Sequence, residues 1–510
     1  MSENLVNNKR IAKNTLFLYL RSIIVMSISV FTSRVVLQTL GVDDYGIYNV
    51  VGGFVAMFSI LSSSLVNASQ RFISFEMGKD NPQMGRLFCG TVSIHLLLAL
   101  CVFLVFESFG IWFLNTQLNI ASDRLTAANW VFQCSVLTFC VNLISVPYNA
   151  SIIAHERMGV FAYISIYEAL AKLGIVYLLW LSYYDRLVIY ALLMLAVSIS
   201  LRLIYGMYCK KKFEECRFHF VIDRPLFKKM LSFSGWNFIG SAAGILSIQG
   251  INILINVFFG VALNAARGIA EQVNTAINQF VSNFMTAMNP QITKSFAAGK
   301  YEYMNKLMFN GAKYATIMFW FLSLPVFIKA EYILDLWLVV VPPYAAVFLR
   351  LTIVYSLFQS LSNTLYIGML ATGNIKKYQI VMGSLYAGTL PLCYFFFKIG
   401  LGPEWGYVSS IIILFLGMFV RLFLLQQMIP FFSFTSFLKG TVLKVLYVIF
   451  VSFVIVKFVS MIQVESSIMS LVFTVFISAV VIPLSAYMLA LEGVERDMIK
   501  VRIRRYFENR

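Results

Sequence analysis

Apolar stretches of about 20 residues recur from one end of this 510-residue chain to the other. An α-helix rises about 1.5 Å per residue, so such a stretch spans the roughly 30 Å hydrocarbon core of a bilayer. With 60% hydrophobic and only 12% charged residues, the composition lies outside the range of soluble globular proteins. We therefore expect an all-α, polytopic membrane protein without a separate soluble domain.

The apolar stretches predict about fourteen transmembrane helices, the first over residues 14–37 and the last over residues 467–490. Basic residues test this division, because Lys and Arg accumulate on the cytoplasmic side of a membrane. They alternate strongly, with 26 on one set of connections and 5 on the other. Both termini are therefore predicted to be cytoplasmic. The same bias accounts for the net charge of +17, so we expect no nucleic-acid partner.

The longest inner connection, residues 209–230, divides the predicted helices into two sets. We expect an N-terminal six-helix bundle (1–208), a cytoplasmic linker (209–230), a second six-helix bundle (231–430), and two extra helices with a basic cytoplasmic tail (431–510). A short repeat supports this division, because SFEMGK at 74–79 recurs as SFAAGK at 295–300. Both copies follow the second helix of their half. Parallel repeats of this kind predict a pseudo-twofold along the membrane normal, with a transport path between the bundles.

The predicted span 265–289 carries one polar face along its whole length. Its polar residues follow one another at steps of three or four: Arg267, Glu271, Asn274, Asn278, Ser282, Thr286 and Asn289. Such a face lines a water-filled cavity or mediates close helix packing. An Arg, a Glu and several amides on one face favour the cavity. The span 46–68 carries a smaller version, from Tyr45 to Gln70, for which both interpretations stay open.

Four cations lie too far from the predicted span ends to reach the interface easily: Arg21, Lys172, Lys313 and Arg350. A charge facing lipid costs about 3 kcal/mol near a helix centre, so we expect all four to face the interior. A cationic cavity suits an anionic substrate such as a phosphate or diphosphate. For Lys172, a purely structural ion pair with Glu168 is an open alternative. Four other cations lie near span ends and are attributed to the interface: Arg34, Arg202, Arg421 and Lys444.

Cysteine and histidine give no sign of a metal or cofactor. The seven Cys and three His are scattered, without paired or ligand-type spacing. The sequence has no P-loop, zinc motif or nucleophile elbow. We expect no cofactor, no metal site and no catalytic residues.

The segment Leu40–Tyr48, LGVDDYGIY, resembles the LG-x-x-x-YG-x-Y signature of bacterial polysaccharide flippases. These belong to the MOP exporter superfamily, with the MATE exporters and lipid II flippases. Residues 265–299 are similar to the second half of the same proteins. The resemblance implies a twelve-helix core whose inner and outer cavities open alternately in the bacterial inner membrane. It also implies an undecaprenyl-diphosphate-linked oligosaccharide as substrate, for O-antigen or lipopolysaccharide synthesis. The two extra helices leave the branch open.

Two other functions compete with this reading. A cation-coupled multidrug exporter of the same superfamily relies on intramembrane carboxylates, and the spans offer only Glu107, Glu168 and Glu271. A membrane-embedded glycosyltransferase or polymerase would use an acidic pair such as Asp43 and Asp44. The short outer loops leave little room for such an active site. We therefore expect a transporter and not an enzyme, with membrane lipids as the other partner and the coupling ion left open.

Overall fold

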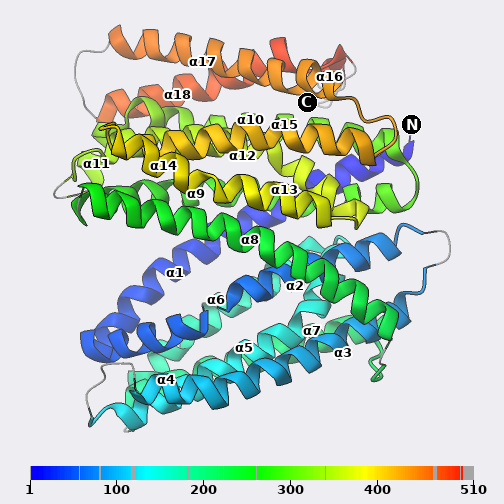
Figure 1. Cartoon of the computed structure of the whole chain (residues 1–510), viewed down its shortest axis with the longest axis vertical. Helices are drawn as coiled ribbons and strands as arrows, with labels where there is room; N and C mark the ends of the chain where they lie inside the picture. Colours follow the sequence, from blue (N-terminus) through cyan, green and yellow to red (C-terminus); the bar gives the residue numbers. More distant parts are fainter. Residues whose placement is uncertain are drawn as a thin grey trace, which may run out of the picture. The chain divides into compact units, whose positions relative to one another are not determined.

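The computed structural model describes residues 2–56, 58–79, 82–116, 122–180, 184–221, 223–259, 261–338, 341–462, 468–493 and 495–497. Within these ranges the protein consists of helices and contains no strand (Figure 1). Eleven helical stretches of the described chain are long and apolar enough to cross a membrane. The other three predicted spans fall on α1, α2 and α9. The prediction of an all-α membrane fold with about fourteen helices is confirmed.

The helices of the N-terminal part are α1 (Ser2–Ala56), α2 (Ser59–Glu76), α3 (Met84–Val105), α4 (Ile111–Thr116), α5 (Leu125–Ala154), α6 (Met158–Trp180) and α7 (Arg186–Lys212). The chain continues through α8 (Arg224–Phe259), α9 (Val261–Ala297), α10 (Tyr301–Ile328), α11 (Ala330–Trp337), α12 (Ala345–Thr372), α13 (Lys376–Ala387) and α14 (Thr389–Lys398). The last helices are α15 (Trp405–Met428), α16 (Phe434–Phe437), α17 (Leu443–Ile462) and α18 (Ile468–Ser485).

The first loop was predicted wrongly. Residues 38–45 were expected to form an outer loop, but α1 continues through them to Ala56. The segment has no proline to break the hydrogen-bond ladder, and its single glycine, Gly41, lowers helix stability without ending the helix. The polar face predicted from Tyr45 to Gln70 is therefore divided between α1 and α2.

The chain forms two compact units. The first contains residues 1–242 and 286–299, and the second contains residues 243–285 and 300–510. The division falls inside α8 and α9, so each of these helices contributes to both units. The linker predicted at 209–230 lies wholly in the first unit. The functional domains predicted from the sequence stay a prediction.

The first unit is built around α5, which packs against α1, α2, α3 and α7. Its core includes Phe106, Val131, Phe132 and Leu143, which are almost fully buried. In the second unit α12 packs against both α10 and α15, and α17 and α18 pack on α10. One hydrogen bond joins α10 to α17, because the Trp320 indole N–H donates to Ser452 Oγ at 2.9 Å.

The two copies of the sequence repeat pack against each other inside the first unit. Gly78 lies so close to the end of α9 that an added Cβ would stand 2.4 Å from the Lys294 carbonyl oxygen and 2.7 Å from Ala297 Cβ. The Phe75 and Phe296 rings lie 6.3 Å apart. Glycine is therefore required at position 78 by this close approach of two helix ends.

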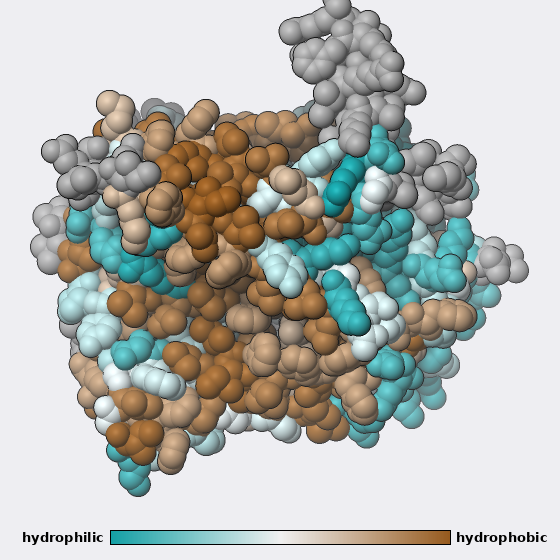
Figure 2. Space-filling view, turned by 90° about the horizontal axis from the view of Figure 1, so that it is seen from above, coloured by the Kyte–Doolittle hydropathy of each residue, from teal (hydrophilic) through white to brown (hydrophobic). Residues whose placement is uncertain are grey.

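The outer surface of α17 and α18 is strongly apolar. Figure 2 looks onto these helices from above and shows a broad hydrophobic surface, with hydrophilic residues mainly on the right and a smaller group on the left. Its exposed side chains include Phe450, Phe458, Met469 and Phe476, each more than 60% exposed. Apolar patches on water-soluble proteins rarely exceed a few hundred Å². The environment of this surface is therefore lipid.

Candidate functional site

The polar face of α9 is held against α12 by hydrogen bonds within the second unit. Asn274 is 7% exposed, and its Oδ1 accepts from Asn278 Nδ2 at 3.0 Å and from Ser356 Oγ at 2.9 Å. Asn278 Nδ2 also lies 3.2 Å from Ser356 Oγ. These bonds fix both amides, so this part of the face is a rigid polar wall inside the unit.

Closer to its start, the same face of α9 packs on α15. The Arg267 side chain is buried, and its guanidinium carbon lies 5.1 Å from the centre of the Tyr407 ring. The Tyr407 hydroxyl donates to Glu271 Oε1 at 3.4 Å. Arg267 Nη1 is buried and has no hydrogen-bond partner among the described residues. Tyr407 thus lies between an arginine and a carboxylate that do not pair directly.

A cavity of about 430 Å³ opens beside this wall in the second unit. Asn278 lines it from α9, together with Tyr355, Gln359 and Asn363 from α12, Tyr386 from α13 and Arg421 from α15. Ser362 also lines the cavity, and its buried hydroxyl has no partner in the described chain. The lining therefore combines hydroxyls, amides, aromatic rings and one cation, and its described residues include no carboxylate.

Arg421 is the residue that the sequence analysis missed. Assigned to the membrane interface, it is in fact 7% exposed, and that assignment was wrong. Its Nε donates to the Tyr378 hydroxyl at 3.1 Å and its Nη2 to the Tyr386 hydroxyl at 2.7 Å. In the described chain no carboxylate lies within ion-pair distance of it. A sequence signal was present, because Gly406, Ser410 and Gly417 share the helix face of Arg421 and mark it as a packed face.

Three of the four predicted cavity cations have carboxylate partners. Lys172 Nζ lies 2.5 Å from Glu168, with both side chains 39% exposed, so the pair considered as an alternative is present. Lys313 is 1% exposed and lies 3.1 Å from Glu495. Their role in transport stays a prediction.

Arg350 and Arg21 differ in their surroundings. Arg350 binds both oxygens of Glu331, at 2.7 and 2.5 Å, and the Phe327 carbonyl at 3.0 Å. Arg21 lies over the Phe161 ring at 4.7 Å, and its buried Nε has no hydrogen-bond partner in the described chain. Arg21 and Lys172 belong to the first unit, and Lys313 and Arg350 to the second without lining its cavity.

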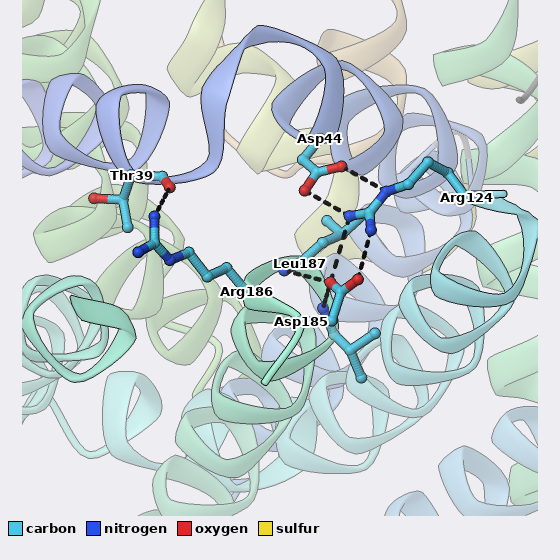
Figure 3. Close-up of polar contacts among 7 residues, drawn as sticks. Thr39, Asp44, Arg124, Asp185, Arg186 and Leu187 are labelled. Atoms are coloured by element: carbon cyan, nitrogen blue, oxygen red, sulfur yellow. Dashed lines mark hydrogen bonds and ion pairs between the residues drawn. The ribbon is translucent and has the colours of Figure 1, made fainter. Parts of the chain in front are cut away.

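A second polar cluster lies in the first unit, at helix ends predicted to face outside. Figure 3 shows Arg124 between the carboxylates of Asp44 and Asp185. Arg124 Nε and Nη2 bind Asp44 at 2.9 and 2.5 Å, and its Nη1 binds Asp185 at 2.5 Å. Asp185 also caps α7 by accepting from the backbone N–H of Leu187 at 3.0 Å. One guanidinium thus joins the starts of α5 and α7 to α1.

This cluster bears on the acidic pair proposed for an enzyme. Asp44 belongs to the LGVDDYGIY segment, and its carboxylate is fully engaged by Arg124. The side chain of Asp43 lies outside the described residues. Although burial opposes it, the hydrogen bonds from Arg124 and the α7 backbone hold the pKa of Asp185 below its ordinary value of 3.8. The Asp185 carboxylate is therefore charged at neutral pH.

Comparison with known families decides the relationship. Residues 11–296 match the model of a family described as "Polysaccharide biosynthesis protein", which is more than half of the chain. The chain belongs to this polysaccharide biosynthesis protein family. The match confirms the expected membership of a family of polysaccharide biosynthesis proteins. A search of curated protein sequences finds no match.

Solved structures with the same fold are MOP-superfamily transporters. A MATE transporter in the bent conformation aligns with a TM-score of 0.68 at 11% identity, covering 83% of this chain and 96% of that one. An outward-facing multidrug resistance MATE transporter gives 0.68 at 12% identity, covering 81% and 95%. A MOP-superfamily transporter from Pyrococcus furiosus gives 0.67 at 11% identity, covering 83% and 96%. At these identities the likeness establishes that this family member has a MATE-like fold.

Proposed function

We propose that the protein flips a lipid-linked oligosaccharide precursor across the bacterial cytoplasmic membrane, for polysaccharide synthesis of the O-antigen or lipopolysaccharide type. The substrate is an undecaprenyl-diphosphate-linked oligosaccharide, moved to the outer leaflet by alternating access. Both termini lie in the cytoplasm. Membership of a polysaccharide biosynthesis family supports the cargo, and the MATE-like fold supports transport.

One observation carries this proposal, namely the chemistry of the cavity in the second unit. Sugar hydroxyls are bound by amides and hydroxyls, and sugar rings pack on aromatic side chains. Asn278, Gln359, Asn363 and Tyr355 offer these groups around a space of about 430 Å³. A few fixed polar groups in a concave pocket are what orients a bound molecule. The lining therefore suits a glycan better than an apolar drug.

Arg421 gives the cavity its charge. Removing a guanidinium from water costs several kcal/mol unless other charges and hydrogen bonds compensate. Its observed partners, the hydroxyls of Tyr378 and Tyr386, are neutral. A phosphate would supply the missing counter-charge and would match the planar fork of the guanidinium. The unpartnered hydroxyl of Ser362 would gain a hydrogen-bond partner from the same ligand.

The residues predicted from the sequence keep a part in this proposal. Arg267, Glu271, Asn274 and Asn278 form the wall on α9. Arg21 lacks a carboxylate within ion-pair distance in the described chain, so its charge is open to a substrate. The proposal gives a supporting role to Lys172, Lys313 and Arg350, whose charges are already balanced.

The multidrug exporter is the second candidate. A cationic drug needs a carboxylate, and the α9 face offers Glu271, held by the Tyr407 hydroxyl at 3.4 Å. The Pyrococcus furiosus transporter is described by the phrase "reverse polarity of binding pocket suggests different function". By the same reasoning, a cavity with an arginine and no lining carboxylate among its described residues favours an anionic cargo over a cationic drug.

Export of surface polysaccharide tests the proposal. A strain lacking the protein should accumulate the lipid-linked precursor and lose surface polysaccharide, and the wild-type protein should restore it. Arg421→Gln should reduce export at least about tenfold, because a charge-assisted hydrogen bond contributes about 1.5–3 kcal/mol. Arg202→Gln is the matched control, since Arg202 also contacts a tyrosine, Tyr148, at 3.8 Å but lies in the first unit. Full export by Arg421→Gln at normal protein levels would contradict the proposal.

The other functions predict different results. Alanine at Arg21, Lys172, Lys313 and Arg350 should each reduce export without removing the protein from the membrane. Normal export from all four variants would refute their assignment. A drug exporter would instead lower resistance to cationic drugs when deleted. An enzyme would transfer sugar as a purified protein and lose that activity on substitution of Asp43 and Asp44.

A further inference from the structure

The connection between α7 and α8 is an ordered part of the first unit. It runs from Phe213 to Asp223, through a short 3-10 turn at Glu214–Cys216. Phe213 and Cys216 are buried at 6% and 3% exposure. The His155 ring stacks on Phe213 with centroids 4.0 Å apart and planes 9° apart, and its Nε2 binds Glu215 at 2.6 Å. These contacts anchor the beginning of the connection.

The second half of the connection is anchored to α3. The Val221 N–H donates to Ser93 Oγ at 3.1 Å, and Asp223 pairs with Arg86 at 2.8 Å. His219 Nδ1 lies 3.3 Å from Cys89 Sγ. A segment that serves only to join two helices does not need contacts at both ends. These contacts fix the backbone of the connection, so its exposed side chains keep a defined position on the surface.

Exposed cations and two phenylalanines gather on this connection and on the ends of α7 and α8 that it joins. The residues Lys210, Lys211, Lys212, Arg217, Phe218, Phe220, Arg224, Lys228 and Lys229 are all exposed, and we call them the basic platform. Phe218 and Phe220 are 43% and 56% exposed, although buried neighbours show that the segment has access to a core. The seven cations of the platform exceed what any other predicted inner connection carries.

Few local carboxylates oppose this charge. Of the three acidic residues in 209–230, Glu215 is held by His155 and Asp223 by Arg86. The hydrogen bond from His155 also lowers the pKa of Glu215 below its ordinary value of 4.5. Because Arg86 lies outside the segment and balances Asp223, Glu214 and Glu215 are left to offset the seven cations. The platform therefore projects a strong positive potential at neutral pH.

We propose that the basic platform is a docking site for anionic phospholipid headgroups of the adjacent leaflet. Lysines dominate it, and a strongly hydrated ammonium suits a diffuse charged surface better than one specific phosphate pocket. Exposed phenylalanines between the cations match the boundary between headgroups and acyl chains. A soluble acidic protein would account for the cations but not for two exposed phenylalanines at the ends of membrane helices. The proposal does not depend on the transported cargo.

Retention of lipid by the purified full-length protein tests this proposal. The protein is reconstituted in nanodiscs of phosphatidylcholine with phosphatidylglycerol, and the retained lipids are measured by native mass spectrometry. Each lysine near an anionic surface contributes about a fivefold factor in binding, so Lys228→Gln with Lys229→Gln should weaken phosphatidylglycerol retention about 25-fold. The matched control is Lys376→Gln with Lys377→Gln, another exposed pair of consecutive lysines on an inner connection.

Two further measurements make the result decisive. Phe218→Ala with Phe220→Ala should lower retention of both lipids while leaving the preference for phosphatidylglycerol. Raising the salt concentration should remove that preference in the wild type, because exposed charges are screened. Equal retention of both lipids by the wild type, or equal losses in the platform and control variants, would overturn the proposal.

Discussion

Substitution of Glu495 should destabilise the second unit far more than substitution of Glu331. Both carboxylates pair with a cation that the sequence placed in a transport cavity. Lys313 is 1% exposed, and its acceptors are Glu495 Oε2 at 3.1 Å and the Ala490 carbonyl at 3.3 Å. Arg350 and Glu331 are 32% and 60% exposed. The two pairs thus differ mainly in burial.

Burial decides the expected magnitude. Glu495→Gln keeps the shape of the side chain and an acceptor for the Tyr314 hydroxyl, but removes the negative charge. The buried ammonium of Lys313 then has only neutral acceptors, and breaking a buried pair costs about 3–5 kcal/mol. Glu331→Gln breaks an exposed pair, for which about 0–1 kcal/mol is typical. Thermal unfolding of the purified protein in detergent should therefore separate the two variants clearly.

A double variant tests whether the expected loss of stability comes from the unpaired charge of Lys313. Lys313→Met with Glu495→Leu removes both charges, and should recover most of the stability lost in Glu495→Gln. Export by this stable double variant then decides the role of Lys313, because a cavity cation is needed for export and a purely structural one is not. The argument would be refuted if Glu495→Gln were no less stable than Glu331→Gln.

Two other predictions concern the first unit. Gly78→Ala should lower the free energy of unfolding by about 1–3 kcal/mol, because the added Cβ would meet the Lys294 carbonyl oxygen at 2.4 Å. Gly85→Ala is the control, since an added Cβ there meets no atom and should leave stability unchanged or raise it. Equal stabilities of the two variants in a thermal melt would contradict this reasoning. Asp185→Asn should destabilise the protein at neutral pH through lost bonds to Arg124. Because the pKa of Asp185 is lowered, its contribution is complete above about pH 4 and disappears as pH falls through the lowered value, so the two stabilities should converge only in acid. A difference that is constant with pH would show that the charge is irrelevant.

The membrane fold was predictable because hydrophobic length is a local property. Each apolar stretch predicts a membrane helix from its own residues alone. The alternation of basic residues between connections then predicts which end of each helix faces the cytoplasm. The repeat at 74–79 and 295–300 was also visible, and the structure adds that its copies touch through Gly78. The first loop was predicted wrongly. Its polar residues suggested a loop, but residues 38–45 contain no strong helix breaker, and the helix continues through them.

Counter-ions were not predictable, because they come from distant parts of the chain. Lys313 pairs with Glu495, which lies 182 residues further along the sequence, and Arg124 pairs with Asp44, 80 residues earlier. The Lys172 pair was foreseen, since Glu168 lies one turn earlier on the same helix. The rule that an intramembrane cation faces the interior therefore says nothing about whether its charge is available to a substrate.

By this criterion Arg421 is a better candidate for binding an anionic substrate than the three predicted cations that have carboxylate partners. Its position near the end of a span suggested the interface, because distance from the span end was the only available criterion. Burial depends instead on the face of the helix. Gly417 on the same face of α15 lets α13 approach closely, since an added Cβ would stand 2.8 Å from Met382 Cε, and Tyr378 and Tyr386 of α13 reach the guanidinium. Phenols hold an arginine in place without neutralising it. A carboxylate in the same place would have neutralised the guanidinium charge that an anionic ligand requires, so neutral partners are what a reusable anion site needs.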